Sequence, residues 1–359
     1  MKPRKIAIFR KRLGQYSETF VRQDIEHLNG GETVVVCRYL VDAPFDWIAE
    51  SRVLVLGRYP RWTWGAHIAW FCWRHRVGFA VVEFLDWACE MQPFIRFLGL
   101  RYVALGHGFD LSSYLQSKAG YAERLNCLSS AAALLVPSEF LKSVLLQATR
   151  LRAEQVEVLP YGVDLSRFAF SPSALRGRLV FVGRFVEKKA PLLLLEAFKC
   201  ALQSGAALQL RLGGDGPLLD AAQAYVIEQG LSEHVTFLGV LSHAAVYEEI
   251  RSATAVVQHS ITAANGDTEG LPVILQEALA VGTPVVATEH SGIPEIVTHG
   301  RHGYLMAEKD VTGMADAMVQ ISQLPEAAYA AMRQACRLQA ETLLSRDRRI
   351  DWIDAQIDD

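Results

Sequence analysis

Two glutamates, Glu269 and Glu277, are the residues of this chain whose type and spacing best suit chemistry on a bound ligand. Glu269 lies just before Pro272, and proline favours the first position of a helix because its fixed φ suits that turn. The pattern predicts a helix over residues 272–281, ended by Gly282. An open helix N-terminus presents unpaired N–H groups and a partial positive charge, so we expect it to bind phosphate.

The two carboxylates would then have different tasks. Glu269 would stand beside a phosphate on the amides of Gly270 and Leu271, where an attached sugar would lie. Glu277 could accept hydrogen bonds from two neighbouring hydroxyls, as on a ribose. The alternative interpretation is that both glutamates are exposed charges near a helix start, where acids are favoured in any case.

Strands must position this helix, and short apolar runs predict them. Residues 255–258 and 284–288 are expected to be strands on either side of it, which gives a strand–loop–helix–strand unit with a right-handed crossover. Further strands are predicted at residues 179–182, 208–212 and 235–238. Arg184 and Lys189 follow the first of these, and two cations on a strand-end loop can neutralise a diphosphate. Two solvated surface charges are the alternative.

The first half of the chain begins in a similar way. A strand over Lys5–Phe9, a basic loop containing Gly14, a helix, and a strand over Thr33–Cys37 are typical of a doubly wound sheet, with the ligand beyond the strand end. The loop lacks the G-x-G-x-x-G fingerprint, which disfavours a nicotinamide dehydrogenase. Other strands are expected at residues 53–57, 101–105, 134–137 and 156–160.

His107 and Asp110 follow the strand predicted at Arg101–Leu105. Gly106 and Gly108 flank the histidine and let the backbone approach a ligand closely. A lone histidine can equally be a structural residue with satisfied hydrogen bonds, and this alternative stays open on the residues alone.

Several runs in the second half together resemble the signature of retaining glycosyltransferases of family 4: residues 266–270, 282–286 and 292–295, with the glutamates spaced E-x7-E. Residues 17–20 resemble the start of exopolysaccharide and colanic-acid-type members. The resemblance implies an α/β chain with the GT-B fold, in which two Rossmann-like domains face a cleft and the last helix crosses back to the first. The implied acceptor domain covers residues 1–170 plus 345–359, and the nucleotide-sugar domain covers residues 171–344.

The same resemblance assigns roles to individual residues. The implied catalytic residues are Glu269, His107 and Asp110. The implied substrate-binding residues are Gly14, Arg184, Lys189, Gly214, Val240, Gly270, Leu271 and Glu277. In this family the histidine contacts the donor sugar, and backbone groups around Val240 would pair with the nucleobase.

The implied function is retaining transfer of a hexose from a UDP- or GDP-linked donor to a glycan acceptor, such as a lipid-linked oligosaccharide in bacterial exopolysaccharide or lipopolysaccharide assembly. No second carboxylate is placed as a nucleophile, so we expect front-face attack by the acceptor hydroxyl. The sequence contains no D-x-D, which predicts a metal-independent enzyme without a cofactor. A GT-B nucleotide-sugar epimerase and a non-catalytic sugar-nucleotide-binding protein are the alternatives.

Composition and charge limit the setting. Hydrophobic residues make up 51% and charged residues 21% of the chain, as in globular proteins, and the six cysteines form no C-x-x-C pair. Residues 1–171 carry 21 Lys and Arg against 16 Asp and Glu, whereas residues 172–359 carry 15 against 23. A basic first half suggests an anionic partner, although no pattern points to nucleic acid.

Residues 58–76 hold four of the seven tryptophans together with Arg58, Arg61, Arg74 and Arg76. Tryptophan rings flanked by arginine suit an anionic membrane surface, whereas a buried helix with arginines on its rim is the alternative. With no signal peptide or membrane span in the pattern, we expect a cytoplasmic protein, peripheral on the inner face of the membrane if this stretch docks there.

Overall fold

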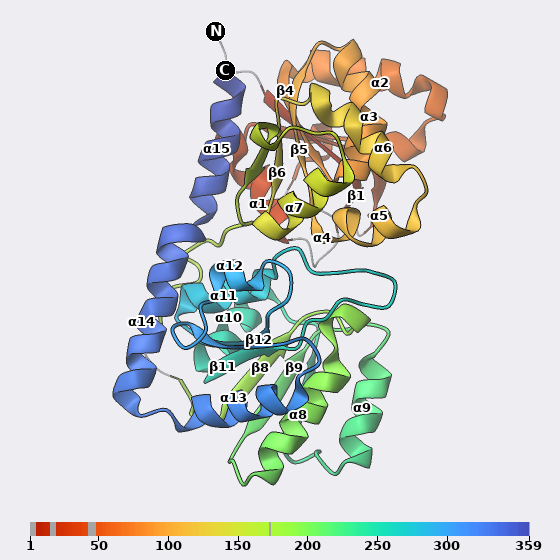
Figure 1. Ribbon diagram of the computed structural model, residues 1–359. Coiled ribbons are helices and arrows are strands. Elements are labelled where there is room, and N and C mark those ends of the chain that lie inside the picture. The colour runs from red at the N-terminus through yellow and green to blue at the C-terminus, as the bar shows by residue number, and fades with distance from the viewer. Residues whose placement is uncertain (1–4, 15–18, 42–47, 172–173, 359) are drawn as a thin grey trace. The chain divides into compact units, whose positions relative to one another are not determined.

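The computed structural model describes residues 5–14, 19–41, 48–171 and 174–358. It divides into two compact units (Figure 1). Unit 1 comprises residues 1–159 and 347–359, and unit 2 comprises residues 160–346. Ser17 and Glu18, part of the string that resembles exopolysaccharide enzymes, lie outside the described residues. The functional domain boundary predicted between residues 170 and 171 stays a prediction.

Unit 1 is built on a seven-stranded parallel sheet, counted over its described residues. Its strands are β1 (Lys5–Leu13), β2 (Thr33–Leu40), β3 (Val53–Val55), β4 (Val77–Glu83), β5 (Arg101–Leu105), β6 (Ala133–Val136) and β7 (Val156–Val158). Their spatial order is β3-β2-β1-β4-β5-β6-β7. The central strands are nearly continuous apolar runs because helices cover both faces of the sheet.

Helices cover the two faces of the unit 1 sheet unequally (Figure 1). One face carries α2 (Trp64–His75), α3 (Leu85–Phe97), α6 (Tyr121–Leu125) and α7 (Glu139–Ala148), with α4 (Gly108–Leu111) and α5 (Ser113–Ser117) nearby. The other carries α1 (Thr19–His27) and the C-terminal α15 (Arg346–Asp358). Arg349 of α15 pairs with Asp24 of α1 at 2.8 Å. The last helix therefore packs on the first unit, which confirms the predicted return crossing.

Unit 2 has a six-stranded parallel sheet over its described residues, in the order β10-β9-β8-β11-β12-β13. The strands are β8 (Arg178–Val182), β9 (Gln209–Gly213), β10 (Val235–Gly239), β11 (Ala255–Gln258), β12 (Val285–Thr288) and β13 (Gly303–Met306). The helices are α8 (Pro191–Gln203), α9 (Leu219–Glu228), α10 (His243–Ser252), α11 (Val273–Val281), α12 (Ile293–Ile296), α13 (Val311–Gln323) and α14 (Glu326–Leu343). Helices α8, α9 and α13 share a core with one face, and α10 and α11 lie on the other (Figure 1).

The strand orders locate where each sheet can bind a ligand. In unit 1 the chain winds one way from β1 to β3 and then the other way from β4, so β1 and β4 are neighbours at the reversal. In unit 2 the neighbours at the reversal are β8 and β11. Open α/β sheets bind ligands beyond the carboxyl ends of strands at such a switch point.

Local predictions are confirmed at some elements and wrong at others. The strands at 101–105 and 255–258 match β5 and β11. The loop predicted from Arg10 is wrong over its first residues because β1 continues to Leu13. Pro272 is the N-cap with ψ 123° and the helix begins one residue later, although Gly282 ends it as predicted.

Helix α2 combines the two interpretations of the tryptophan-rich stretch. Its inner face packs Trp64, Ile68 and Phe71 into the core of unit 1. Its outer face exposes Trp70 and Trp73, whose side chains are 56% and 78% accessible. The helix is therefore buried on one face and strongly apolar toward solvent on the other. Over the described residues, none of the helices is long and apolar enough to span a membrane.

Candidate functional site

The predicted phosphate-binding end of α11 lies in a buried part of unit 2. The loop from β11 reaches α11 through Glu269, Gly270 and Leu271, and the side chains of both Glu269 and Leu271 are buried. Helix α11 itself is buried along nearly its whole length, as expected for a crossover helix between two layers. The alternative that Glu269 and Glu277 are exposed helix-start charges is therefore wrong, since both side chains are buried.

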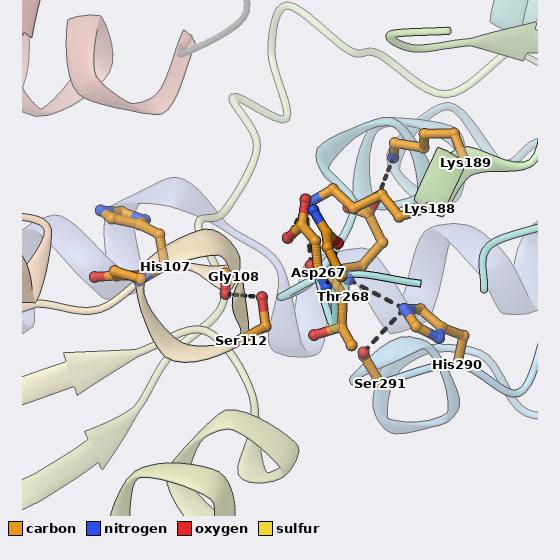
Figure 2. Close-up of polar contacts among 12 residues, drawn as sticks. His107, Gly108, Ser112, Lys188, Lys189, Asp267, Thr268, His290 and Ser291 are labelled. Carbon is orange, nitrogen blue, oxygen red and sulfur yellow. Dashed lines mark hydrogen bonds and ion pairs between the residues drawn. The ribbon is translucent and has the colours of Figure 1, made fainter. Parts of the chain in front are cut away.

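Two lysines from a short turn after β8 face this loop (Figure 2). Lys189 Nζ lies 3.2 Å from Glu269 Oε1. Lys188 Nζ lies 3.1 Å from Asp267 Oδ1 and donates a hydrogen bond to the Thr268 carbonyl at 3.0 Å. The interpretation of Lys189 as a solvated surface charge is thus wrong, because its side chain is nearly covered and paired.

The opposite charges of Glu269 and Lys189 stabilise each other because the two side chains are close together. Burial alone would raise the pKa of Glu269, but the nearby Lys189 and Lys188 outweigh it and lower the pKa of that carboxyl. Burial lowers the pKa of Lys189, and the charge of Glu269 opposes the shift. Glu269 is therefore ionised at neutral pH and is a ready acceptor for hydroxyl groups.

Glu277 has a different electrostatic setting. Burial raises its pKa to about 8, and the charge of Arg167 only partly offsets the effect. The carboxyl therefore carries a proton near neutral pH in this unliganded chain.

Glycines bring the strand-end loops of β8, β9 and β10 close together. Gly214 has φ 130°, and its N–H donates to the Gly239 carbonyl at 2.7 Å. A Cβ on Gly214 would lie 1.9 Å from the Gly183 carbonyl oxygen, so only glycine fits between the two loops. Arg184, which follows Gly183, and Val240, which follows Gly239, are both exposed at this edge.

The structure adds a histidine–carboxylate pair that sequence reasoning missed. His290 follows β12, is buried, and lies 2.5 Å through Nδ1 from Glu308 Oε1. Its Nε2 accepts a hydrogen bond from the backbone N–H of Glu269 at 3.0 Å, and Ser291 Oγ lies 3.1 Å from the same nitrogen (Figure 2). The position of His290 two residues before the run at 292–295 was the only available signal.

In unit 1 the predicted residues His107 and Asp110 form a reciprocal cap on α4. The His107 ring accepts a hydrogen bond from the Asp110 N–H, and Asp110 Oδ1 accepts from the His107 N–H at 2.7 Å. The other ring nitrogen, Nε2, lies 2.9 Å from Glu83 Oε2 at the end of β4. Both ring nitrogens of His107 are therefore engaged inside unit 1. Gly14, with φ 107°, directly follows the end of β1.

The buried acids near His107 are Glu83, Asp24 and Asp110, and of these only Asp110 was predicted from the sequence. Burial raises the pKa of Glu83, with Arg349 and Arg10 opposing the shift. Burial also raises the pKa of Asp24 to about 6, although Arg349 pairs with it. The pKa of Asp110 is raised well above its ordinary value by burial, although two backbone N–H groups bind the carboxylate.

The structure thus gathers the predicted residues in two groups. Unit 2 brings together Lys189, Glu269, Gly270 and Leu271, with Glu277 farther along α11 and with Arg184, Gly214 and Val240 at the neighbouring strand ends. Unit 1 brings together His107 and Asp110. Over the described part of the chain, no cluster of three or more His, Cys, Asp or Glu side chains is arranged to hold a metal ion.

Comparison with known proteins supports the resemblance of unit 2 to sugar transferases. Residues 170–339 match the family described as glycosyl transferases group 1. The chain is 33% identical over 221 residues to WcaL of Escherichia coli, which is named as a colanic acid biosynthesis glycosyltransferase; the match covers 61% of this chain and 54% of WcaL. It is 33% identical over 212 residues to the amylovoran biosynthesis glycosyltransferase AmsK of Erwinia amylovora, covering 58% of this chain and 52% of AmsK. The matches thus span about half the length of these relatives.

Solved structures extend the likeness of fold to the whole chain. The HepE protein of Anabaena, crystallised in complex with UDP and glucose, superposes with a TM-score of 0.80 over 99% of this chain and 98% of HepE, at 17% identity. A sucrose-phosphate synthase from Thermosynechococcus elongatus gives 0.79 over 98% of each chain, at 18% identity. Together with the two parallel sheets, these matches establish the GT-B fold.

Proposed function

We propose that this chain, whose residues 170–339 match the group 1 glycosyl transferases, transfers a hexose from a nucleotide-diphosphate sugar to a glycan acceptor with retention of configuration. The observation that carries the proposal is the buried Lys189–Glu269 ion pair beside the N-terminus of α11. A cation, an ionised acid and the backbone that leads into α11 meet there. These are the groups needed to bind a diphosphate and the sugar attached to it.

Each group has a defined task in the proposed reaction. As the bond between the sugar and the diphosphate breaks, negative charge grows on the departing phosphate oxygens. Lys189, Arg184 and the amides of Gly270 and Leu271 stabilise that charge without reorganising, which lowers the barrier. Glu269 accepts hydrogen bonds from sugar hydroxyls, and the acceptor hydroxyl attacks on the face from which the diphosphate leaves.

The nucleoside would lie along the strand ends of unit 2. Glu277 accepts hydrogen bonds from the ribose hydroxyls once it is ionised, and the backbone at Val240 pairs with the base edge. The glycine at 214 keeps the loops of β8 and β9 close enough for both phosphates to be bound. We retain the proposals that Gly14, His107 and Asp110 of unit 1 act on the donor sugar and acceptor, that residues 1–170 with 345–359 form the acceptor domain, and that the enzyme needs no metal.

Relatives suggest which donors to test first. HepE was crystallised with UDP-glucose, and a relative from Mycobacterium tuberculosis, 29% identical over 223 residues, is named as GDP-mannose-dependent; the match covers 57% of this chain and 52% of that protein. The colanic acid and amylovoran biosynthesis relatives support a place in exopolysaccharide assembly, and the acceptor that we propose is a lipid-linked oligosaccharide.

The test uses a panel of UDP- and GDP-sugars in two steps. Thermal unfolding with each sugar identifies the donor, because a ligand at 100 times its Kd stabilises the fold by about 2.7 kcal/mol. The selected donor is then incubated with a lipid-linked oligosaccharide, and the anomeric configuration of the product is read by NMR. A new glycosidic bond of retained configuration supports the proposal. Release of a free epimer would favour an epimerase, and binding without turnover a sugar-nucleotide-binding protein.

We also propose that the outer face of α2 docks unit 1 on an anionic membrane. Trp70 and Trp73 are exposed, and Phe97 of α3 is 84% accessible. A hollow of about 690 Å³ lined by Trp73, Arg74 and Arg76 lies beside them. Aromatic rings next to arginine suit the interface of anionic lipid headgroups and acyl chains. A membrane-bound position would bring the enzyme to a lipid-linked acceptor.

Vesicle flotation tests this docking. Vesicles of phosphatidylglycerol and phosphatidylcholine should carry the protein at low salt, whereas pure phosphatidylcholine should not. The double variant Trp70→Ala, Trp73→Ala should lose flotation, whereas Ile227→Ala, which removes an exposed apolar side chain of α9, should not. Equal flotation of all three proteins, or none for the wild type, would refute the docking.

A further inference from the structure

The loop that carries Glu269 is fixed at two points by a single pair of side chains. Glu308, just beyond β13, accepts a hydrogen bond from the Thr262 N–H at 2.9 Å through Oε2. Its Oε1 lies 2.5 Å from His290 Nδ1, and His290 in turn binds the Glu269 N–H. Thr262 and Glu269 lie near the two ends of the loop between β11 and α11. The His290–Glu308 pair therefore ties both ends of that loop to the strand ends of β12 and β13.

The direction of these hydrogen bonds defines the protonation state of His290. A backbone N–H can only donate, so Nε2 must present its lone pair to Glu269. The single proton of the neutral ring then lies on Nδ1, where it is donated to Glu308. A protonated His290 would turn an N–H toward the Glu269 amide and break the bond, because two donors would face each other.

The carboxylate of Glu308 suits the role of the fixed partner. Burial tends to raise its pKa, but hydrogen bonds from His290 and Thr262 outweigh that effect and lower it. It is therefore ionised at neutral pH and holds the Nδ1–H form of the ring. Carboxylates that orient histidine in this way fix both its tautomer and its plane.

Backbone strain marks both sides of this arrangement. Ser291, directly after His290, has φ 49°, and Ala190, directly after Lys189, has φ 41°. Residues other than glycine rarely adopt such values, and the surrounding structure must maintain them. Glu269 lies between the two strained turns, with its amide on His290 and its carboxylate on Lys189.

We infer that His290 and Glu308 are positioning residues that set the orientation of Glu269, and that they do so only while His290 is neutral. The inference rests on the proposed function, in which Glu269 holds the donor sugar. Removing the histidine acceptor frees the peptide of Glu269 to turn, which misplaces its carboxylate and the neighbouring amides. Acidic pH has the same effect by protonating the ring, so turnover falls on the acid side.

Several charged groups face this pair. Glu308 faces His290 from the end of β13, and it also acts on His259 at the end of β11. Glu269 faces it from the loop before α11, and Lys188 and Lys189 stand behind Glu269 after β8. Carboxylates and lysine ammonium groups thus both lie near the ring. The variants below therefore change one of these groups at a time.

The test compares three variants with the wild type in steady-state kinetics from acid to neutral pH. His290→Ala should lower kcat about 10- to 100-fold with a smaller change in donor KM, because a misplaced group costs more in the transition state than in binding. His290→Gln retains an acceptor oxygen near the Nε2 position but cannot be protonated, so it should recover much of the activity and lose the acid limb. Glu308→Gln should move the acid limb to lower pH.

His302 provides the matched control. It is also buried in unit 2, and its Nδ1 accepts a hydrogen bond from the Thr298 N–H at 3.0 Å, but it precedes β13 at the opposite edge of the sheet. His302→Asn should affect thermal stability without changing the pH profile. If His290→Ala and His302→Asn lose only stability and keep the wild-type kcat and acid limb, the inference is wrong while the proposed function stands.

A second readout is independent of turnover. Hydrogen exchange at the Glu269 amide, followed by NMR on protein labelled with ¹⁵N-glutamate, should be slow in the wild type and in His290→Gln and faster in His290→Ala. Unchanged exchange in His290→Ala would overturn the inference even if the enzyme proved inactive on every nucleotide sugar. Inactivity of the wild type with donor bound would instead refute the proposed function, and the exchange rates would still decide the geometric claim.

Discussion

The two units contain the same small arrangement in opposite electrostatic settings. In unit 1, His107 lies 2.9 Å from Glu83, and its other ring nitrogen accepts the backbone N–H of Asp110. In unit 2, His290 lies 2.5 Å from Glu308, and its other ring nitrogen accepts the backbone N–H of Glu269. Each histidine therefore holds the peptide of an acidic residue predicted to be catalytic.

The carboxylates of the two arrangements differ. Glu83 is fully buried, and burial raises its pKa, whereas hydrogen bonds lower the pKa of the partly exposed Glu308. The two acids whose backbone N–H groups bind the histidines differ in the same way. The pKa of Asp110 is raised and that of Glu269 is lowered. Burial therefore raises the pKa of the unit 1 acids Glu83 and Asp110, whereas Lys189 and Lys188 keep Glu269 of unit 2 ionised. Only the setting in unit 2, with its lysines, is suited to binding an anionic diphosphate.

The largest effect should come from removing the ionised acid of unit 2. Glu269→Ala should lower turnover about 100-fold or more, because the sugar loses the group that orients it for attack. The fold should survive, since Lys189 can lose its proton once its partner is gone. Turnover with the selected donor and the thermal midpoint of the variant check both statements. Near-normal turnover would remove Glu269 from the site.

A second prediction concerns Asp24, a buried acid of unit 1. Arg349→Met leaves Asp24 buried without its partner, which should cost about 3–5 kcal/mol of unfolding free energy if the acid stays charged. The pKa of Asp24 is already raised to about 6 and should rise further in the variant, so the acid can take up a proton instead. The loss should therefore be largest near pH 8 and smaller near pH 5, measured by urea unfolding.

The exposed pair Arg22–Glu26 on α1 is the control for this comparison. Arg22→Met should change the unfolding free energy by less than about 0.5 kcal/mol at either pH, because surface pairs contribute little. An equal loss for the two variants would mean that the buried pair does not tie α15 to unit 1.

Glu277 is the exception within unit 2, and it predicts a pH dependence of stability. Its folded pKa of about 8 lies above the ordinary value of 4.5, so the folded chain binds a proton more tightly than the unfolded chain does. The stability that this proton provides is complete below about pH 4.5 and is lost as the pH rises toward 8. Across this pH range the wild type should lose at most about 4 kcal/mol of unfolding free energy, and Glu277→Gln should not show this loss. Parallel pH profiles for variant and wild type would contradict the raised pKa.

The sequence predicted His107 and Asp110 of the unit 1 arrangement but only Glu269 of the unit 2 arrangement. His107 and Asp110 stand in a short motif after a predicted strand, and Glu269 stands in one just before a predicted helix, where local spacing is informative. Glu83 is the last residue of β4 and Glu308 lies just beyond β13, and neither strand was predicted. Strand β4 lies in a long apolar stretch between α2 and α3, where periodicity does not separate a strand from a helix, and β13 has only four residues.

Pairing across the sheet explains the rest of what was missed. Glu83 meets His107 and Glu308 meets His290 only because parallel strands bring their carboxyl ends to one edge. Sequence spacing alone does not tell which acid will face which histidine. The helix end at Gly282 was predictable because it depends on a few neighbouring residues.

The smallest expected effect is the sharpest check on the contrast between the units. Glu83→Gln retains an oxygen that can accept the hydrogen bond from His107, and it replaces an acid whose pKa burial raises. Its unfolding free energy should therefore change by less than about 1 kcal/mol, a typical net value for one hydrogen bond. The acid limb of activity should stay at the wild-type pH, in contrast to Glu308→Gln, where removal of a charged partner should move it to lower pH. A large loss of stability in Glu83→Gln at pH 7 would mean that Glu83 is ionised, and the electrostatic difference between the two units would disappear.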